Sequence, residues 1–145
     1  MKSHKIFSFF VKHFWFLKAV PIAPRLFDSL LRLWLLFTDF KLLQWIDEIE
    51  SEILNWEGVN VRMHKFGGLQ FDYKKAEIGH LHSNGLMDIS FSRVMKQKLI
   101  DEGRVSSHHV FNNTGWISFT LRSKDDVNYA IRLMKVSYDH KRNKE

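Results

Sequence analysis

The sequence predicts an α+β fold, an antiparallel sheet with helices packed on one face, preceded by an N-terminal aromatic helical segment. Apolar residues recur at helical spacing up to about residue 56, and the period changes towards two after Gly58. A last helical pattern follows at 124–139. Short loops between successive strands favour antiparallel pairing, which leaves the helices to cover one face. With 145 residues, 45% of them hydrophobic, the chain can form one core with an appendage.

The first third of the chain has the pattern of two helices. Helical spacing dense in Phe and Trp covers about 5–19 and 25–38, with a proline-containing break at 21–24. We therefore expect a basic aromatic helical extension at 1–38 and an α+β domain at 39–145.

Positive charge concentrates in the same region. Residues 1–44 hold seven basic side chains against two acids, so they carry five of the six net charges. The extension is therefore expected to pack on the domain, to lie on an anionic membrane surface, or to bind a protein partner. Nucleic acid is disfavoured, because the remaining two-thirds of the chain is close to neutral.

The sequence also bounds the compartment and the chemistry. There is no cysteine, which excludes disulfides, thiolate catalysis and thiolate metal sites and fits a reducing compartment. The uncharged runs in the extension are too short to span a bilayer. We expect a cytoplasmic protein, held peripherally at the membrane if residues 1–38 bind lipid.

The regular elements after residue 38 follow from periodicity and capping. Residues 39–56 predict an amphipathic helix whose acids, Glu48, Glu50 and Glu52, lie on its solvated face. Ser92 and Ser123 are expected N-caps. We expect strands at 59–65, 68–74, 77–82, 86–91, 105–111 and 115–122, helices at 93–102 and 124–139, and disorder at 140–145.

The central hairpin admits two registers. A two-residue turn at 84–85 would pair His80 with Ile89, whereas a three-residue turn at 83–85 would pair His80 with Asp88. A one-residue slip exchanges the two faces of a strand. The three-residue turn is favoured, because it separates the two histidines of this hairpin, His80 and His82, from the apolar residues that need a core.

A polar sheet face follows from this register. If the protein is an enzyme, we expect the catalytic residues to be His80, His82 and Asp88, with the two histidines as acid–base or ligand groups and Asp88 orienting one imidazole. His108 and His109 should point in opposite directions on their strand, so that one of them joins this face. The residues expected to bind a ligand are His108, His109, Trp116, Asp72 and Ser90.

Three interpretations of this face remain open. The histidines either hydrogen-bond to polar neighbours, form an acid–base or small-ligand site, or share a zinc, iron or manganese ion. The His-x-His spacing at His80 and His82 is compatible with metal, but the third and fourth ligands are not recognisable. No metal ligands are assigned and the cofactor is left open.

The segments HKFGGLQFDYKKAEIGHLHSNGLMDISFS, EGRVSSHHV and GWISFTLRS resemble the family of luciferase-domain proteins over about 60–139. The most specific pieces are 77–82, Gly103, His108-His109 and Gly115-Trp116. The resemblance implies a small α+β domain of that family, and its name implies a light-emitting oxidation. The function expected is a small-ligand or acid–base site, and the alternative is a non-enzymatic binding module for a protein partner or an anionic membrane.

Overall fold

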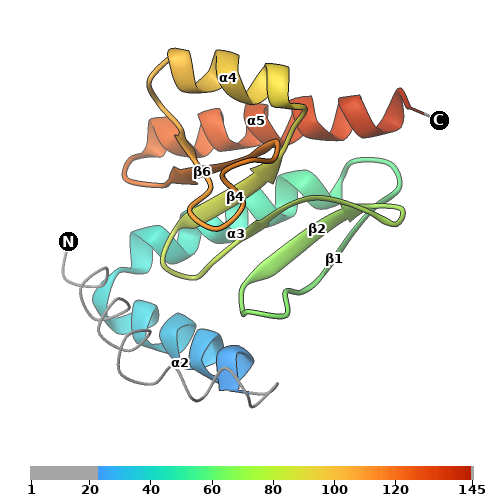
Figure 1. Cartoon of the computed structure of the whole chain (residues 1–145). Coiled ribbons are helices and arrows are strands. Elements are labelled where there is room, and N and C mark those ends of the chain that lie inside the picture. Colours follow the sequence, from blue (N-terminus) through green and yellow to red (C-terminus); the bar gives the residue numbers. More distant parts are fainter. Residues whose placement is uncertain (1–22, 145) are drawn as a thin grey trace.

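The computed structural model describes residues 23–144, and Figure 1 shows how their elements follow one another. The helix expected at 5–19 lies outside the described residues. The elements are α2 (Ala23–Thr38), α3 (Phe40–Leu54), β1 (Val59–Met63), β2 (Leu69–Tyr73), β3 (Ala76–Leu81), β4 (Leu86–Ser90), α4 (Arg93–Asp101), β5 (Ser106–Ser107), β6 (Trp116–Thr120) and α5 (Lys124–Arg142).

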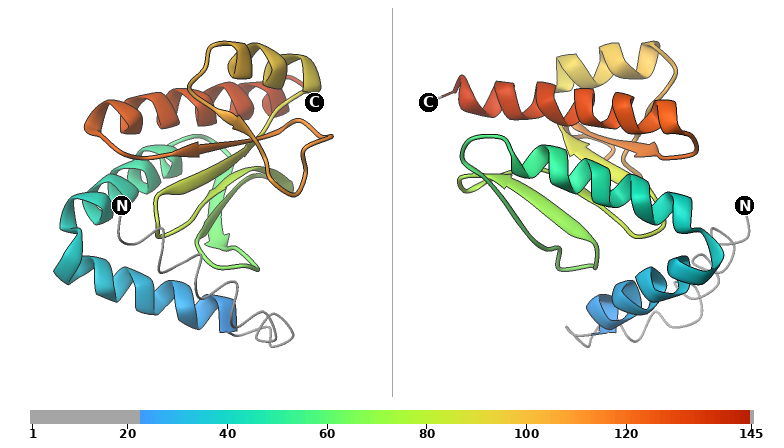
Figure 2. Two further views of the ribbon diagram at one scale, coloured as in Figure 1. Left: turned by 60° about the vertical axis from the view of Figure 1, so that its left-hand side comes forward. Right: turned by 180° about the vertical axis from the view of Figure 1, so that it is seen from behind.

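The strands form one antiparallel sheet in the order β1-β2-β3-β4-β6-β5. α3 and α5 contact each other and cover one face of this sheet, as the view from behind in Figure 2 shows. α4 contacts β5 and β6 at the far edge. The predicted α+β class, with helices on one face of an antiparallel sheet, is confirmed.

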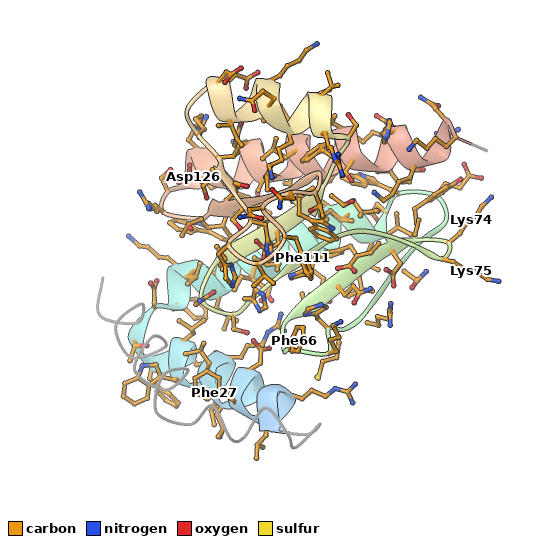
Figure 3. All side chains as sticks on the ribbon, in the orientation of Figure 1. Phe27, Phe66, Lys74, Lys75, Phe111 and Asp126 are labelled. Carbon is orange, nitrogen blue, oxygen red and sulfur yellow. The ribbon has the colours of Figure 1, made fainter. Side chains whose placement is uncertain are left out.

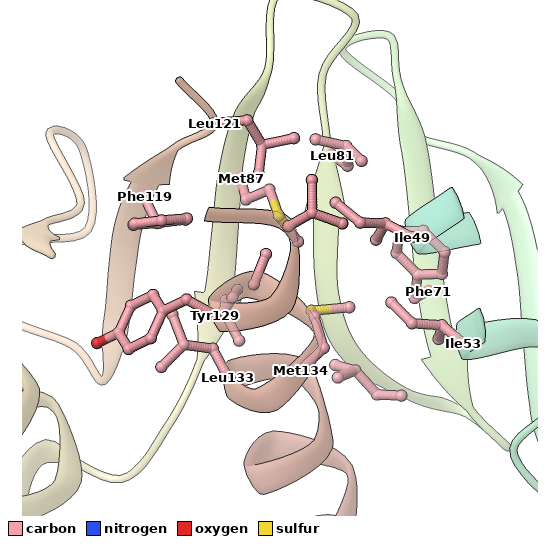
Figure 4. Packing of buried hydrophobic residues seen from close by; sticks show 14 of the residues in the cluster. Ile49, Ile53, Phe71, Leu81, Met87, Phe119, Leu121, Tyr129, Leu133 and Met134 are labelled. Atoms are coloured by element: carbon pink, nitrogen blue, oxygen red, sulfur yellow. The ribbon is translucent and has the colours of Figure 1, made fainter. Parts of the chain in front are cut away.

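The core fills the space between these two helices and the sheet, and Figure 4 shows its centre. Ile49 and Ile53 project from α3 and Met134 from α5, and all three are fully buried against the sheet residues Phe71 and Leu81. Burial of one such aliphatic side chain stabilises the fold by about 1.5–3 kcal/mol. This layer determines which face of each strand turns towards the helices, and therefore which residues remain on the opposite face.

The β3–β4 hairpin has the predicted three-residue turn. His80 pairs with Asp88, and the His82 N–H donates to the Leu86 carbonyl at 2.8 Å. Gly85 has a φ of 82°, in the left-handed region that favours glycine. Both histidines therefore lie on the face away from the helices, as expected.

The strand expected at 105–111 is much shorter. Regular pairing stops after Ser107, because the chain turns at His108. Nδ1 of His108 accepts the N–H groups of both Val110 and Phe111 at 3.0 Å.

The C-terminus also differs from the prediction. Disorder was expected from residue 140, but α5 continues to Arg142. His140, Lys141 and Arg142 form its last turn, where cations interact favourably with the helix dipole. Lys141 is also held between the Ser90 carbonyl and the Ser137 hydroxyl, each 3.5 Å from its Nζ.

Two side chains on one side of α2 join that helix to the domain. Leu35 is buried in the core cluster, and Asp28 Oδ1 accepts the Ser83 N–H of the β3–β4 turn at 3.3 Å. The division into 1–38 and 39–145 stays a prediction. Between residues 23 and 144, no helix combines the length and apolar character needed to cross a membrane.

The first turn of α5 provides a test of the fold. Asp126 accepts hydrogen bonds from the Ser123 hydroxyl, the Arg122 N–H and Arg104. Burial raises the pKa of Asp126, but these bonds outweigh it and hold that pKa below the ordinary 3.8. The ionised form therefore stabilises the fold above pH 3.8, and this contribution disappears as the pH falls through the lower, folded-state pKa.

We expect Asp126→Asn to lower the free energy of unfolding near neutral pH by about 1 kcal/mol. The measurement is urea denaturation at several pH values, and the difference from the unmodified protein should close below pH 3.8. Asp125→Asn is the control, because that side chain is 72% exposed and should matter less. Equal losses in the two variants would contradict the assignment.

Candidate functional site

A buried carboxylate lies at the centre of the polar sheet face. Asp88 is 2% exposed, and its Oδ2 atom faces the Nε2 atoms of three histidines. The distances are 3.2 Å to His80, 3.8 Å to His82 and 3.6 Å to His108. The other oxygen, Oδ1, accepts a hydrogen bond from the Ser118 hydroxyl, directly opposite Asp88 in the β4–β6 register.

His108 belongs to this centre, and its ring is fixed by the turn that ends β5. Because Nδ1 accepts two backbone N–H groups, the proton of the neutral ring must lie on Nε2, which faces Asp88. Figure 3 shows Phe111 of the same turn in front of the sheet, and its ring lies 5.0 Å from that of His108. His108 is thus positioned as a donor towards the carboxylate.

The prediction that His108 and His109 point in opposite directions is wrong. The two rings stack with centroids 4.7 Å apart, and His109 is exposed. The alternation rule fails here because the strand has already ended at Ser107.

His64 completes the cluster, although it is not among the site residues expected from the sequence. Its ring stacks on that of His80 with centroids 4.0 Å apart and planes within 9°. It is 5% exposed, and its Nδ1 atom has no hydrogen-bond partner. A signal was present, because in the strand expected at 59–65 residues 60, 62 and 64 share one face. Arg62 pairs with Gln70 beside His80, so His64 follows on the polar face.

The remaining predicted residues lie around the centre. Trp116 tilts against His80 with ring centroids 5.6 Å apart. Asp72 is buried but is engaged by Arg62 at 2.6 Å and Gln70 at 2.8 Å. Ser90 lies further along β4, opposite Trp116. The structure therefore gathers His80, His82, Asp88, His108 and Trp116, whereas His109, Asp72 and Ser90 lie outside the cluster.

The pKa of His80 is raised, unlike those of the other histidines in the cluster, because two carboxylates bond to its ring. Burial lowers the pKa of His80, but bonds to Asp88 and to Glu77, 2.7 Å from Nδ1, raise it above its ordinary value. Burial lowers the pKa of Asp88's neighbours His82 and His108, and repulsion from His80 adds to the effect on His82.

The pKa values of His64 and Asp88 are both lowered, for different reasons. Burial, followed by repulsion from His80, lowers the pKa of His64 to about 4. Burial raises the pKa of Asp88, but hydrogen bonds from His80 and Ser118 outweigh it and lower that pKa below its ordinary value. The site therefore favours an ionised Asp88 beside a cationic His80, with neutral imidazoles around them.

Three histidines also meet the spacing of a metal site. One ring nitrogen from each of His64, His80 and His82 lies within 4.8 Å of the other two. These residues come from the end of β1 and from β3, so the fold of the sheet supplies the third ligand that the His-x-His motif lacks.

Comparison with protein families identifies the segment that carries most of this centre. Residues 75–137 match the family model of the Luciferase domain, which confirms the predicted resemblance. The matched segment is less than half of the chain and includes His80, His82, Asp88 and His108, but not His64. No curated protein and no solved structure matches the chain.

The role of the carboxylate in the fold can be measured directly. We expect Asp88→Asn, which keeps the side-chain shape but removes the charge, to lower the free energy of unfolding by about 3 kcal/mol, because it leaves buried partners unpaired. Asp72→Asn on the same face is the matched control, since its charged partner Arg62 has a 63% exposed side chain. Chemical denaturation of both metal-free variants gives the comparison, and a loss for Asp88→Asn no larger than that for Asp72→Asn would contradict this role.

Proposed function

We propose that the protein works through a metal ion held by His64, which precedes the segment similar to the Luciferase domain, and by His80 and His82 within that segment, with Asp88 as the fourth ligand. The observation that carries this proposal is the convergence of three imidazole nitrogens within 4.8 Å of one another. Imidazole suits zinc, copper, iron and nickel, and a carboxylate adds a hard oxygen ligand. The predicted roles of His80, His82 and Asp88 as reactive groups are replaced here by roles as ligands.

Two of the histidines have a nitrogen available for an ion. Glu77 engages Nδ1 of His80, so an ion would bind Nε2, where it would replace the proton that now bonds to Asp88 at 3.2 Å. Nδ1 of His64 is buried and has no hydrogen-bond partner. A buried polar atom without a partner is unfavourable, and an ion at this place would satisfy it.

The surrounding contacts would hold these ligands in position. Glu77 orients His80, while Ser118 and His108 restrain the carboxylate of Asp88. Metal-binding histidines usually donate a hydrogen bond from the N–H of their second ring nitrogen to a carboxylate or carbonyl, as His80 does to Glu77. His108 belongs to this outer group, because the backbone already occupies its Nδ1 atom.

The ligand set indicates the reaction class. Sets of histidines with one carboxylate hold iron in enzymes that use dioxygen, and the family's name refers to an oxidation. We therefore propose metal-dependent oxidation of a small organic substrate by dioxygen, which accepts the electrons that the substrate loses. Zinc held by the three histidines alone, with its fourth position left open, would instead indicate activation of bound water, and a metal-free protein would favour the acid–base pair of His80 and Asp88.

Metal analysis of the purified protein tests this proposal. We expect about one equivalent of a transition metal by plasma mass spectrometry after anaerobic reconstitution with Fe²⁺, and separately with Zn²⁺ or Mn²⁺. Bound metal should also stabilise the fold, by about 2.7 kcal/mol when free metal is about 100 times the Kd. His64→Ala should abolish both effects.

The matched control is His109→Ala, because His109 is an exposed histidine next to the centre. This variant should bind metal as the unmodified protein does. Absence of metal in the folded, unmodified protein would refute the proposal, and so would retention of full affinity by His64→Ala.

Glu77 provides a second test that leaves every ligand in place. We expect Glu77→Gln to weaken metal affinity by about 10- to 100-fold without changing the stoichiometry, because it removes the carboxylate that orients His80. Competition with a chelator of known affinity measures the change. Glu57→Gln is a suitable control on an exposed acid, and equal affinities in the two variants would remove Glu77 from the site.

A further inference from the structure

Outside the histidine centre, one side of α2 exposes large apolar side chains that the fold does not use. Large apolar side chains project from it at spacings of three and four residues, so they form one stripe along the helix. Phe37 is 82% exposed, and each of the others is more than half exposed. The apolar stripe consists of Leu26, Leu30, Leu33, Trp34 and Phe37.

The opposite side of the helix is already used. Leu35 is buried in the core and Asp28 is bonded to the β3–β4 turn, so α2 cannot rotate to bury the stripe without losing both contacts. Figures 1 and 2 show α2 at one corner of the molecule, where it contacts α3 but does not itself cover the sheet. Among residues 23–144, which the structure describes, nothing therefore covers the stripe.

The charged residues of α2 indicate what kind of surface the apolar stripe binds. α2 carries three charged residues, Arg25, Asp28 and Arg32. The acid is buried, whereas Arg25 is exposed and Arg32 half-buried. The accessible charges of this helix are thus both positive, and no acid precedes Asp28 in the sequence.

We propose that the apolar stripe of α2 lies on an anionic phospholipid surface, with Leu, Trp and Phe side chains at the boundary of the acyl chains and Arg25 and Arg32 among the headgroups. Helices in this position combine a large apolar face with basic residues at its borders, and aromatic rings are favoured at that depth. Arginine adds attraction to anionic lipid, and salt weakens it. The proposal is independent of the metal centre.

The experiment is sedimentation of the full chain with vesicles of phosphatidylcholine alone or of equal parts phosphatidylcholine and phosphatidylserine. We expect binding to the anionic vesicles that decreases with added salt. Leu30→Glu/Leu33→Glu should reduce the partition coefficient by about tenfold or more. Arg25→Gln and Arg32→Gln should each reduce it by about fivefold.

The control variant is Val94→Glu, which places the same charge on an exposed valine of α4, 70% accessible. It should bind as the unmodified chain does, and circular dichroism should show that all variants are folded. Full-length protein that stays in the supernatant would overturn the proposal, as would unchanged binding by Leu30→Glu/Leu33→Glu. Dimerisation lost in that variant, without vesicle binding, would assign the stripe to a second copy of the chain instead.

Discussion

The buried carboxylate of Asp88 is the interaction on which the rest of this site depends. A carboxylate in a protein interior is costly unless charged or hydrogen-bonding partners surround it. The partners come from separate parts of the sheet, with His80 on β3, Ser118 on β6 and His108 in the turn after β5. Each can reach Asp88 only in the observed pairing of β4 with both neighbours. The charge and the register therefore stabilise each other, and a slip by one residue would leave the carboxylate unpaired among apolar side chains.

The same strands tie the polar centre to the core on the other face. At Gly79, opposite Ile89, a Cβ atom would lie 2.6 Å from the Asp88 carbonyl oxygen and 3.1 Å from Sδ of Met134 in α5. A side chain there would displace either β4 or the helix. Glycine thus permits α5 to approach the hairpin closely, and the approach keeps β4 fixed where it presents Asp88. Packing on the helical face consequently restricts the positions of polar groups on the other face.

This dependence explains how much could be predicted from the sequence. The faces of the hairpin followed from alternation, because only the three-residue turn keeps Met87 and Ile89 in the core while exposing His80 to Asp88. His64 was harder, since its place beside His80 depends on how β1 pairs with β2, which residue patterns do not specify. The orientation of His109 was wrong for a related reason. A side-chain nitrogen of His108 ends β5 by binding backbone N–H groups, and periodicity carries no information on such a contact.

The histidines of the centre differ in how many of their ring nitrogens have a hydrogen-bond partner. This difference distinguishes a histidine that stabilises the fold from one that is available to bind a ligand. Both nitrogens of His108 face partners, two backbone donors on one side and Asp88 on the other. His64 is equally buried, yet its Nδ1 atom is left unpaired, at a cost of about 1–3 kcal/mol. A fold under selection for stability alone would replace such a side chain by an apolar one of similar size. Retention of polar groups that the fold itself leaves unsatisfied is typical of functional sites, and the unpaired Nδ1 atom of His64 therefore supports the proposed role of this residue in binding a metal ion.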